Sequence, residues 1–116
     1  MWSVGGVTIY SVVAEHGRED AVGFIIDDGE KKYYVTGDTL YNEEIFEDIP
    51  DDVYALFLPI NGVGNNMNAV DAARFFRASG AKKAMPYHVG MFDTLSPADF
   101  QEKNRVIAKI YEEIEV

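Results

Sequence analysis

Hydrophobic residues in the first third of the chain come in short runs that turn-forming residues separate. The runs are rich in β-branched and aromatic side chains and cover residues 7–13, 22–26 and 33–35. Runs of this length and composition are typical of β-strands. The dipeptide Asp28-Gly29 lies between the second and third runs. Because Asp-Gly is typical of a tight turn, the sequence predicts an antiparallel hairpin there.

From residue 42 onward the pattern predicts helices alternating with strands. Residues 42–48 place Ile45 and Phe46 among acidic side chains, which favours a short helix that ends before Pro50. A buried strand is expected over residues 53–58. The first helix therefore leads back into the sheet.

A second helix is expected over residues 68–79. Asn68 can cap it, and Asp71 lies in the first turn, where the helix dipole favours an acid. Gly80 can end the helix in a left-handed conformation. Both ends of this helix are therefore marked in the sequence.

The last third of the chain has weaker signals. Residues 84–85 are expected to form a short strand. A serine at a cap position followed by proline predicts a helix over residues 96–109. Residues 110–116 alternate apolar and acidic side chains, which we interpret as a last strand. The alternation of strands and helices predicts an α/β fold, a mixed sheet with flanking helices and parallel pairing in its later part.

Size and charge narrow the function classes. A chain of 116 residues fits one domain, residues 1–116. It has 20 acidic and 10 basic residues, a net charge of −10, which disfavours binding to nucleic acid and to anionic membrane surfaces. The absence of cysteine excludes disulfides and thiolate zinc sites. With no long apolar run and no signal-peptide pattern, a cytoplasmic location is expected.

Three polar residues with metal-binding side chains follow predicted strands: His16, Asp38 and His88. Functional side chains collect where the strands of α/β sheets end. Imidazole and carboxylate groups suit zinc, manganese or iron, and a carboxylate can bridge two ions. Spacing alone leaves the alternative that these are ordinary capping or hydrogen-bonded residues.

Motifs around these three residues occur in a known order. The segments are Ala14-Glu15-His16, Tyr33-Tyr34-Val35-Thr36-Gly37-Asp38-Thr39, Leu58-Pro59-Ile60-Asn61-Gly62 and Pro86-Tyr87-His88-Val89-Gly90. Over nearly the whole chain this order resembles the second half of a metallo-β-lactamase-fold hydrolase. The branch with ascorbate-6-phosphate lactonase-like enzymes is the most similar.

The resemblance implies a fold, a site and an activity. The fold would be the C-terminal half of a four-layer αββα sandwich. By motif, Asp38 would bridge two metal ions, zinc or manganese, while His16 would bind one and His88 the other. The activity would be hydrolysis of a lactone, ester or phosphoester of a small polar metabolite, with attack by a hydroxide that bridges the ions.

One departure from the family pattern limits these expectations. The His-x-His-x-Asp-His loop of the family is absent, and the chain has two histidines in all. Three ligands are too few for two ions, so metal binding by this chain alone is expected to be weak or absent. The expected partners are the N-terminal half of the hydrolase or a second copy of the chain, together with a small-molecule substrate.

A glycine- and asparagine-rich loop over residues 61–67 follows the predicted strand 53–58. It lacks a phosphate-loop lysine, which argues against nucleotide binding. In the resembling family this loop borders the site, so Asn61 and Gly62, together with Tyr87, are candidate substrate contacts. The alternative is a flexible connection. The acidic residues between 43 and 52 lack the spacing of a calcium loop and are interpreted as a solvated face.

A second function class stays open. The chain could be a non-catalytic acidic domain that has kept the fold and lost the chemistry. Half of a sandwich leaves an apolar sheet face, and such a face binds a protein partner or self-associates.

Overall fold

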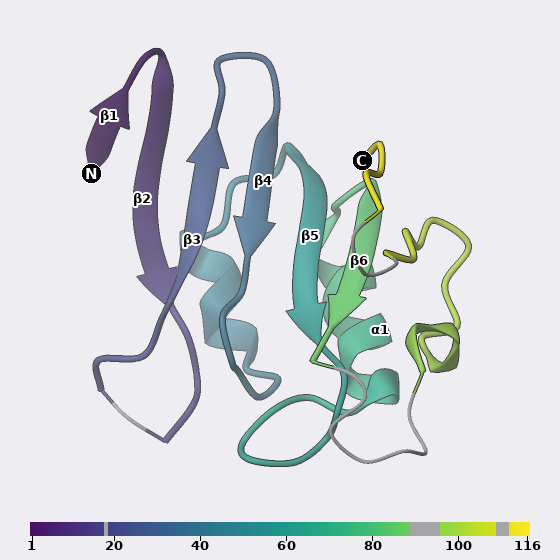
Figure 1. Cartoon of the computed structure of the whole chain (residues 1–116). Helices are drawn as coiled ribbons and strands as arrows, with labels where there is room; N and C mark the ends of the chain where they lie inside the picture. Colours follow the sequence, from purple (N-terminus) through teal and green to yellow (C-terminus); the bar gives the residue numbers. More distant parts are fainter. Residues whose placement is uncertain (18, 89–95, 109–111) are drawn as a thin grey trace.

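One mixed sheet holds the strands of this chain in the order β1-β2-β3-β4-β5-β6 (Figure 1). The computed structural model describes residues 1–17, 19–88, 96–108 and 112–116. The strands are β1 Trp2–Val4, β2 Val7–Val13, β3 Val22–Asp27, β4 Lys32–Val35, β5 Val53–Pro59 and β6 Lys83–Tyr87. The first three junctions are antiparallel, and the β4–β5 and β5–β6 junctions are parallel. The mixed α/β fold, the β3–β4 hairpin and the later parallel pairing are thus confirmed.

The helix α1, Ala69–Ser79, has the ends that the sequence predicts. The Asn68 side chain accepts a hydrogen bond from the Asp71 amide at 2.8 Å, which caps the first turn. Gly80 ends the helix with φ 73°, a left-handed conformation. The shorter helix η1, Glu43–Asp48, is a 3-10 helix capped by Asn42. No helix in the described ranges is long and apolar enough to cross a membrane.

Both helices lie on the same side of the sheet (Figure 1). The sheet face beneath them carries the buried residues Ile25, Tyr34 and Leu56, which occupy paired positions on β3, β4 and β5. Phe75 of α1 packs against the Tyr34 ring, and Phe46 of η1 packs against Phe75. The hydrophobic core therefore lies between this face and the helices.

The opposite face of the sheet is also apolar, although no helix of the described residues covers it. Two rows of side chains run across it by strand register. One row is Trp2, Ile9, Ile26 and Tyr33, and the other is Phe24, Val35, Phe57 and Met85. These eight residues are called the open face below. Trp2 is 62% exposed and Phe24 is 43% exposed.

The predicted helix over residues 96–109 is wrong. Only the short η2, Pro97–Asp99, forms at its start, with the expected Ser96 cap. The chain then leaves the helix because Phe100 is fully buried against Phe76. The segment after it pairs with β6, where the Ala84 amide donates to Asn104 and Ala84 accepts from Val106. Tertiary pairing overrides the local helix start; residue 109 lies outside the described residues.

Two other differences concern the ends of the chain. The predicted last strand over 110–116 does not form in residues 112–116, where the Val116 carbonyl instead accepts a hydrogen bond from the Tyr54 hydroxyl; residues 110 and 111 lie outside the described residues. The strand β1 was not predicted. It pairs with β2 through a two-residue turn, Gly5-Gly6, in which both φ angles are positive. Positive φ at both positions is typical of the type I′ turn of two-residue hairpins, and glycine adopts it without strain.

Candidate metal centre at the carboxyl edge of the sheet

Strand direction brings four carboxyl ends to one edge of the sheet. The strand β3 is antiparallel to both β2 and β4, so β2 and β4 run the same way. The strands β5 and β6 are parallel to β4. His16 follows β2, Asp38 follows β4, the loop 61–67 follows β5 and His88 follows β6. Segments that are far apart in the sequence therefore meet at this edge.

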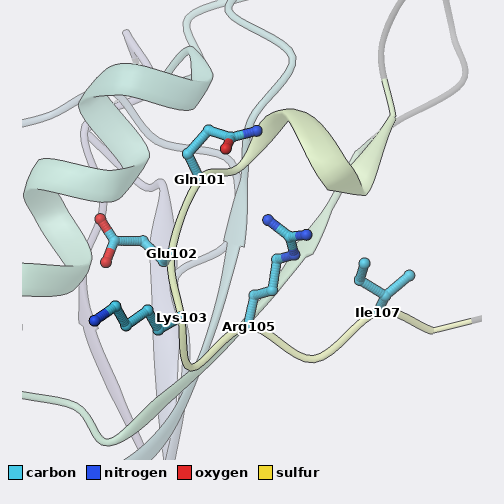
Figure 2. A pocket seen from close by; sticks show the side chains of 5 residues that line it. All are labelled: Gln101, Glu102, Lys103, Arg105 and Ile107. Carbon is cyan, nitrogen blue, oxygen red and sulfur yellow. The ribbon is translucent and has the colours of Figure 1, made fainter.

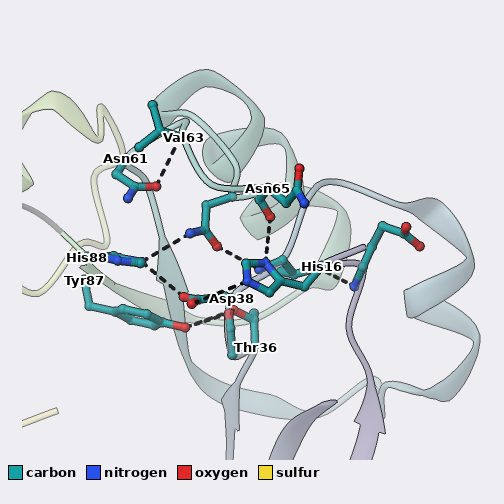
Figure 3. A network of polar contacts seen from close by, with 12 residues as sticks. His16, Thr36, Asp38, Asn61, Val63, Asn65, Tyr87 and His88 are labelled. Atoms are coloured by element: carbon teal, nitrogen blue, oxygen red, sulfur yellow. Dashed lines mark hydrogen bonds and ion pairs between the residues drawn. The ribbon is translucent and has the colours of Figure 1, made fainter. Parts of the chain in front are cut away.

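The Asp38 carboxylate lies between the two imidazole rings (Figure 3). Its Oδ1 is 3.1 Å from His88 Nδ1, and its Oδ2 is 3.9 Å from His16 Nε2. The three side chains are 27% to 41% exposed, so they are open to solvent on one side. The structure thus brings together all three residues that the sequence nominates as metal ligands.

The turn that carries Asp38 is fixed by hydrogen bonds to the segment that carries His16. The Thr39 hydroxyl, which is buried, accepts from the Glu15 amide at 2.9 Å, and the Leu40 amide donates to the Glu15 carbonyl at 2.7 Å. Gly37 has φ 68°, and a Cβ there would lie 2.6 Å from the Val22 carbonyl oxygen. Only glycine fits this position, so the Gly-Asp-Thr motif has a local backbone reason.

Tyr87 fastens the end of β6 to the same turn. Its hydroxyl donates to the Gly37 carbonyl at 2.7 Å, and its ring stacks on His88. Burial raises the pKa of the Tyr87 hydroxyl above its ordinary value. His88 itself has φ 61°, an uncommon conformation for a residue other than glycine. The hydroxyl of Tyr87, a predicted substrate contact, is thus already used within the chain.

The loop 61–67 lies over this site and contacts both histidines (Figure 3). The Asn65 carbonyl lies 3.1 Å from His16 Nδ1, and the Asn66 side-chain Nδ2 lies 3.3 Å from His88 Nδ1. Asn61 is half-buried, and its side chain accepts from the Val63 amide. The exposed Gly62 donates its amide to Met67. Sequence reasoning singled out Asn61 and Gly62 and missed Asn65 and Asn66.

The three side chains are of types that bind metal ions, but they are fewer than a two-metal site needs. Two imidazoles and a carboxylate are ligand types that zinc and manganese accept. Within residues 1–17, 19–88, 96–108 and 112–116, however, no group of three or more histidine, cysteine, aspartate or glutamate side chains is arranged to hold a metal ion. The described residues therefore include suitable ligand types, but their arrangement does not hold a metal ion.

Two other regions carry polar side chains. The acidic residues Glu43, Glu44, Glu47, Asp48, Asp51 and Asp52 are all exposed. One of them, Asp52, forms an ion pair with Lys32 at 2.8 Å. A hollow of about 550 Å³ lies along the segment after η2 and is lined by Gln101, Glu102, Lys103, Arg105 and Ile107 (Figure 2). Glu102 pairs there with Arg77 of α1. Neither region includes His16, Asp38 or His88.

Comparison with known proteins gives matches to solved structures alone. A scan against protein-family models and a search of curated proteins each find no match. The metallo hydrolase Igni18 from Ignicoccus hospitalis matches 90% of this chain and 50% of its own, with 22% identity and a TM-score of 0.76. A protein from Parabacteroides distasonis assigned as a metal-dependent hydrolase matches 90% of this chain and 52% of its own, with 26% identity and a TM-score of 0.72.

The metallo-β-lactamase fold protein YhfI from Bacillus subtilis matches 93% of this chain and 49% of its own, with 24% identity and a TM-score of 0.68. The chain therefore spans about half the length of the solved structures that it matches. It has the mixed α/β architecture of metallo-β-lactamase-fold proteins over that half.

Proposed function

We propose that this chain contributes the C-terminal half of a metal-dependent hydrolase of the metallo-β-lactamase superfamily. The observation that carries the proposal is the meeting of His16, Asp38 and His88 at one sheet edge, with Asp38 in the middle. The names of the matched structures support a metal-dependent hydrolase. The cytoplasmic location stays a prediction from the sequence.

In this proposal Asp38 is the catalytic residue and the shared ligand of two divalent ions, zinc or manganese. His16 serves one ion and His88 the other, and the remaining ligands come from the half that this chain does not contain. Bound metal ions supply a nucleophile by lowering the pKa of water and polarise the bond to be cleaved. This chain's own contribution is to hold Asp38 between the two rings, through the bonds of Thr39 and Tyr87.

The substrate class is a lactone, ester or phosphoester of a small polar metabolite, as in the ascorbate-6-phosphate lactonase-like branch. Asn61 and Gly62 are the proposed contacts because their loop also touches both site histidines. Tyr87 is the weakest of the three proposed contacts, since its hydroxyl already donates to Gly37. Its ring, stacked on His88, is the part left to meet a substrate.

The open face supports the proposed partner, which is the other half of the hydrolase. The open face includes Phe24, which is half-exposed. A hollow of about 380 Å³ on this face is lined by Phe24, Trp2, Ile9, Ile26 and Val35. Exposed apolar patches of this kind mark surfaces that another layer covers. A second layer of similar size accords with matched structures about twice as long as this chain. We therefore assign the open face to that second layer.

Metal binding by calorimetry tests the proposed function. Zinc or manganese is titrated into the chain, an Asp38→Ala variant and an Asp48→Ala variant, whose carboxylate is exposed on η1. We expect weak binding by the chain, its loss in Asp38→Ala and its retention in Asp48→Ala. Measurable binding by the chain that persists at equal strength in Asp38→Ala would overturn the assignment of Asp38 as a ligand.

A second candidate function rests on the same open face. The chain would be a non-catalytic acidic domain that pairs with a second copy of itself through this face. Sedimentation of the chain from 1 to about 100 μM, the range in which weak interfaces form, separates the two candidates. A saturable dimer with no metal binding supports the second candidate, and a monomer throughout overturns it.

A further inference from the structure

The loop 61–67 places one hydrogen-bonding group against each site histidine. We propose that Asn65 and Asn66 are positioning residues for the two rings: the Asn65 carbonyl keeps the hydrogen of His16 on Nδ1. Asn66 competes with Asp38 for His88 Nδ1 and decides which ring nitrogen carries the hydrogen once the Asp38 carboxylate is removed. The relevance of the tautomers to catalysis rests on the proposed function, because only the ring nitrogen with a free electron pair can ligate a metal. The control of the tautomers is itself a property of this chain without metal.

His16 has the simpler arrangement. Its Nδ1 lies 3.1 Å from the Asn65 carbonyl oxygen. A carbonyl oxygen can only accept, so Nδ1 must carry the hydrogen. In the neutral ring the free electron pair is then on Nε2, the nitrogen that faces Asp38 Oδ2 at 3.9 Å. The main chain of Asn65 therefore turns the free pair of His16 toward the middle of the site.

Asn66 is oriented by the turn that carries Asp38. The residue is 4% exposed, and its Oδ1 accepts a hydrogen bond from the Thr39 amide at 3.0 Å. Because the amide oxygen is committed to this bond, the group that faces His88 Nδ1 at 3.3 Å is Nδ2. An amide nitrogen can only donate. Asn66 therefore offers a hydrogen to His88, and its orientation is not free to reverse.

His88 Nδ1 meets two groups with opposite requirements. Asp38 Oδ1, at 3.1 Å, can only accept a hydrogen bond, and Asn66 Nδ2, at 3.3 Å, can only donate one. A single ring nitrogen can form only one of these two hydrogen bonds at a time. Hydrogen bonds to an ionised carboxylate are roughly twice as strong as neutral ones, so Asp38 prevails and Nδ1 carries the hydrogen. Asn66 is the donor that takes over when the Asp38 carboxylate is removed.

The consequence is a two-way choice at His88. With Asp38 in place, the neutral ring has its hydrogen on Nδ1. Without Asp38, Asn66 donates to Nδ1, and the hydrogen moves to Nε2. A merely structural Asn66 would not produce this reversal, because packing does not distinguish the two tautomers.

Long-range ¹⁵N–¹H NMR of the two imidazole rings tests the proposal in the metal-free chain. Spectra are recorded over a pH series, so that the neutral rings are observed. The shift of each ring nitrogen reports whether it carries a hydrogen. The variants are Asp38→Ala, Asp38→Ala with Asn66→Ala, and Asp38→Ala with Asn61→Ala as the matched asparagine control from the same loop. Asp38 is 41% exposed, so its truncation leaves no buried cavity.

We expect a neutral His88 with the hydrogen on Nδ1 in the unmodified chain and on Nε2 in Asp38→Ala. The added Asn61→Ala change should keep the hydrogen on Nε2. The added Asn66→Ala change should remove that preference. The Asn66→Asp change keeps an acceptor for Thr39 and replaces the donor by an acceptor, so with Asp38→Ala it should return the hydrogen to Nδ1. His16 should keep its hydrogen on Nδ1 in every variant, which reports an intact loop.

A His88 tautomer that is the same with and without Asn66 in the Asp38→Ala background would overturn the proposal, provided that His16 is unchanged. If His16 changes as well, the Asn66→Asp variant is used instead, because it preserves the bond to Thr39. A His88 hydrogen that stays on Nε2 in that variant would then overturn the proposal. The measurement uses neither metal nor substrate. Failure here therefore leaves the proposed hydrolase function standing, and failure of metal binding leaves the tautomer control standing.

Discussion

The two faces of the sheet are both apolar, yet the chain buries them differently. The face under α1 and η1 carries Ile25, Tyr34 and Leu56, each less than 1% exposed. The open face carries Trp2 and Phe24, exposed by 62% and 43%. Strands whose two faces are apolar are typical of a sheet that lies between two layers. The difference therefore teaches that an apolar pattern on both faces does not by itself say which face the helices of the chain cover.

The largest effect on stability is expected on the covered face. Leu56→Ala should lower the free energy of unfolding by about 2–5 kcal/mol, because it opens a cavity in a fully packed core. Urea denaturation of the chain and the variant measures this loss. A similar loss for Phe24→Ala on the open face would break the comparison, since the two faces would then be equally packed.

Alkaline pH should destabilise the folded chain next, through two tyrosine hydroxyls whose pKa is raised by burial. Burial raises the pKa of the Tyr34 hydroxyl far above its ordinary value, and of Tyr87 to a smaller extent. The unfolded chain therefore loses these protons first, so stability is intact below pH of about 10 and falls as pH rises through and above it. Each tyrosine contributes up to about 1.4 kcal/mol per pH unit in that range. Urea midpoints from pH 7 to pH 11 should decline in the chain and decline less in Tyr34→Phe; parallel declines would contradict a buried Tyr34.

Tyr34→Phe should also raise stability slightly at neutral pH. The Tyr34 hydroxyl is buried and has no hydrogen-bond partner among the residues that the structure describes. Removing it eliminates the cost of an unpaired buried polar group, about 1 kcal/mol. Thermal unfolding at pH 7 measures the gain. A loss of stability would instead show that the hydroxyl finds a partner, such as water, and that the covered face is less dry than its exposure indicates.

The smallest change in stability is expected on the open face. Phe24→Ser should alter the free energy of unfolding by no more than about 0.5 kcal/mol, as is usual for surface positions. It should nevertheless reduce any concentration-dependent association of the isolated chain in sedimentation. Val70→Ser is the matched control, because Val70 is 71% exposed on α1, away from the open face. If both variants reduce association equally, the open face is not the contact surface.

Local signals in the sequence were sufficient for much of the fold. Asn68 and Gly80 mark the ends of α1, and Asp28-Gly29 marks the β3–β4 turn, because caps and turns act within a few residues. The helix expected after Ser96 fails for the opposite reason. The burial of Phe100 and the pairing with Ala84 involve partners that no local pattern names.

The candidate site also contains residues that the sequence could indicate and residues that it could not. His16, Asp38 and His88 could be nominated because each follows a strand and lies in a recognisable motif. Asn66 could not, because its role depends on a bond to Thr39 and a contact with His88, which are remote in the sequence. A loop of consecutive asparagines indicates turns, and only the fold decides which amide turns inward.

The assembly of the candidate site from four separate strand ends bears on the order of folding. The Asn65–His16 contact joins positions 49 residues apart, and the Asn66–Thr39 and Asn66–His88 contacts join positions 27 and 22 residues apart. Closing such loops costs more entropy than closing the hairpins β1–β2 and β3–β4. The antiparallel part can therefore form early and without the rest. His16 and Asp38 follow β2 and β4, which belong to the antiparallel part, whereas His88 reaches Asp38 only after β6 has paired in parallel with β5. The complete site is therefore a reporter of completed topology.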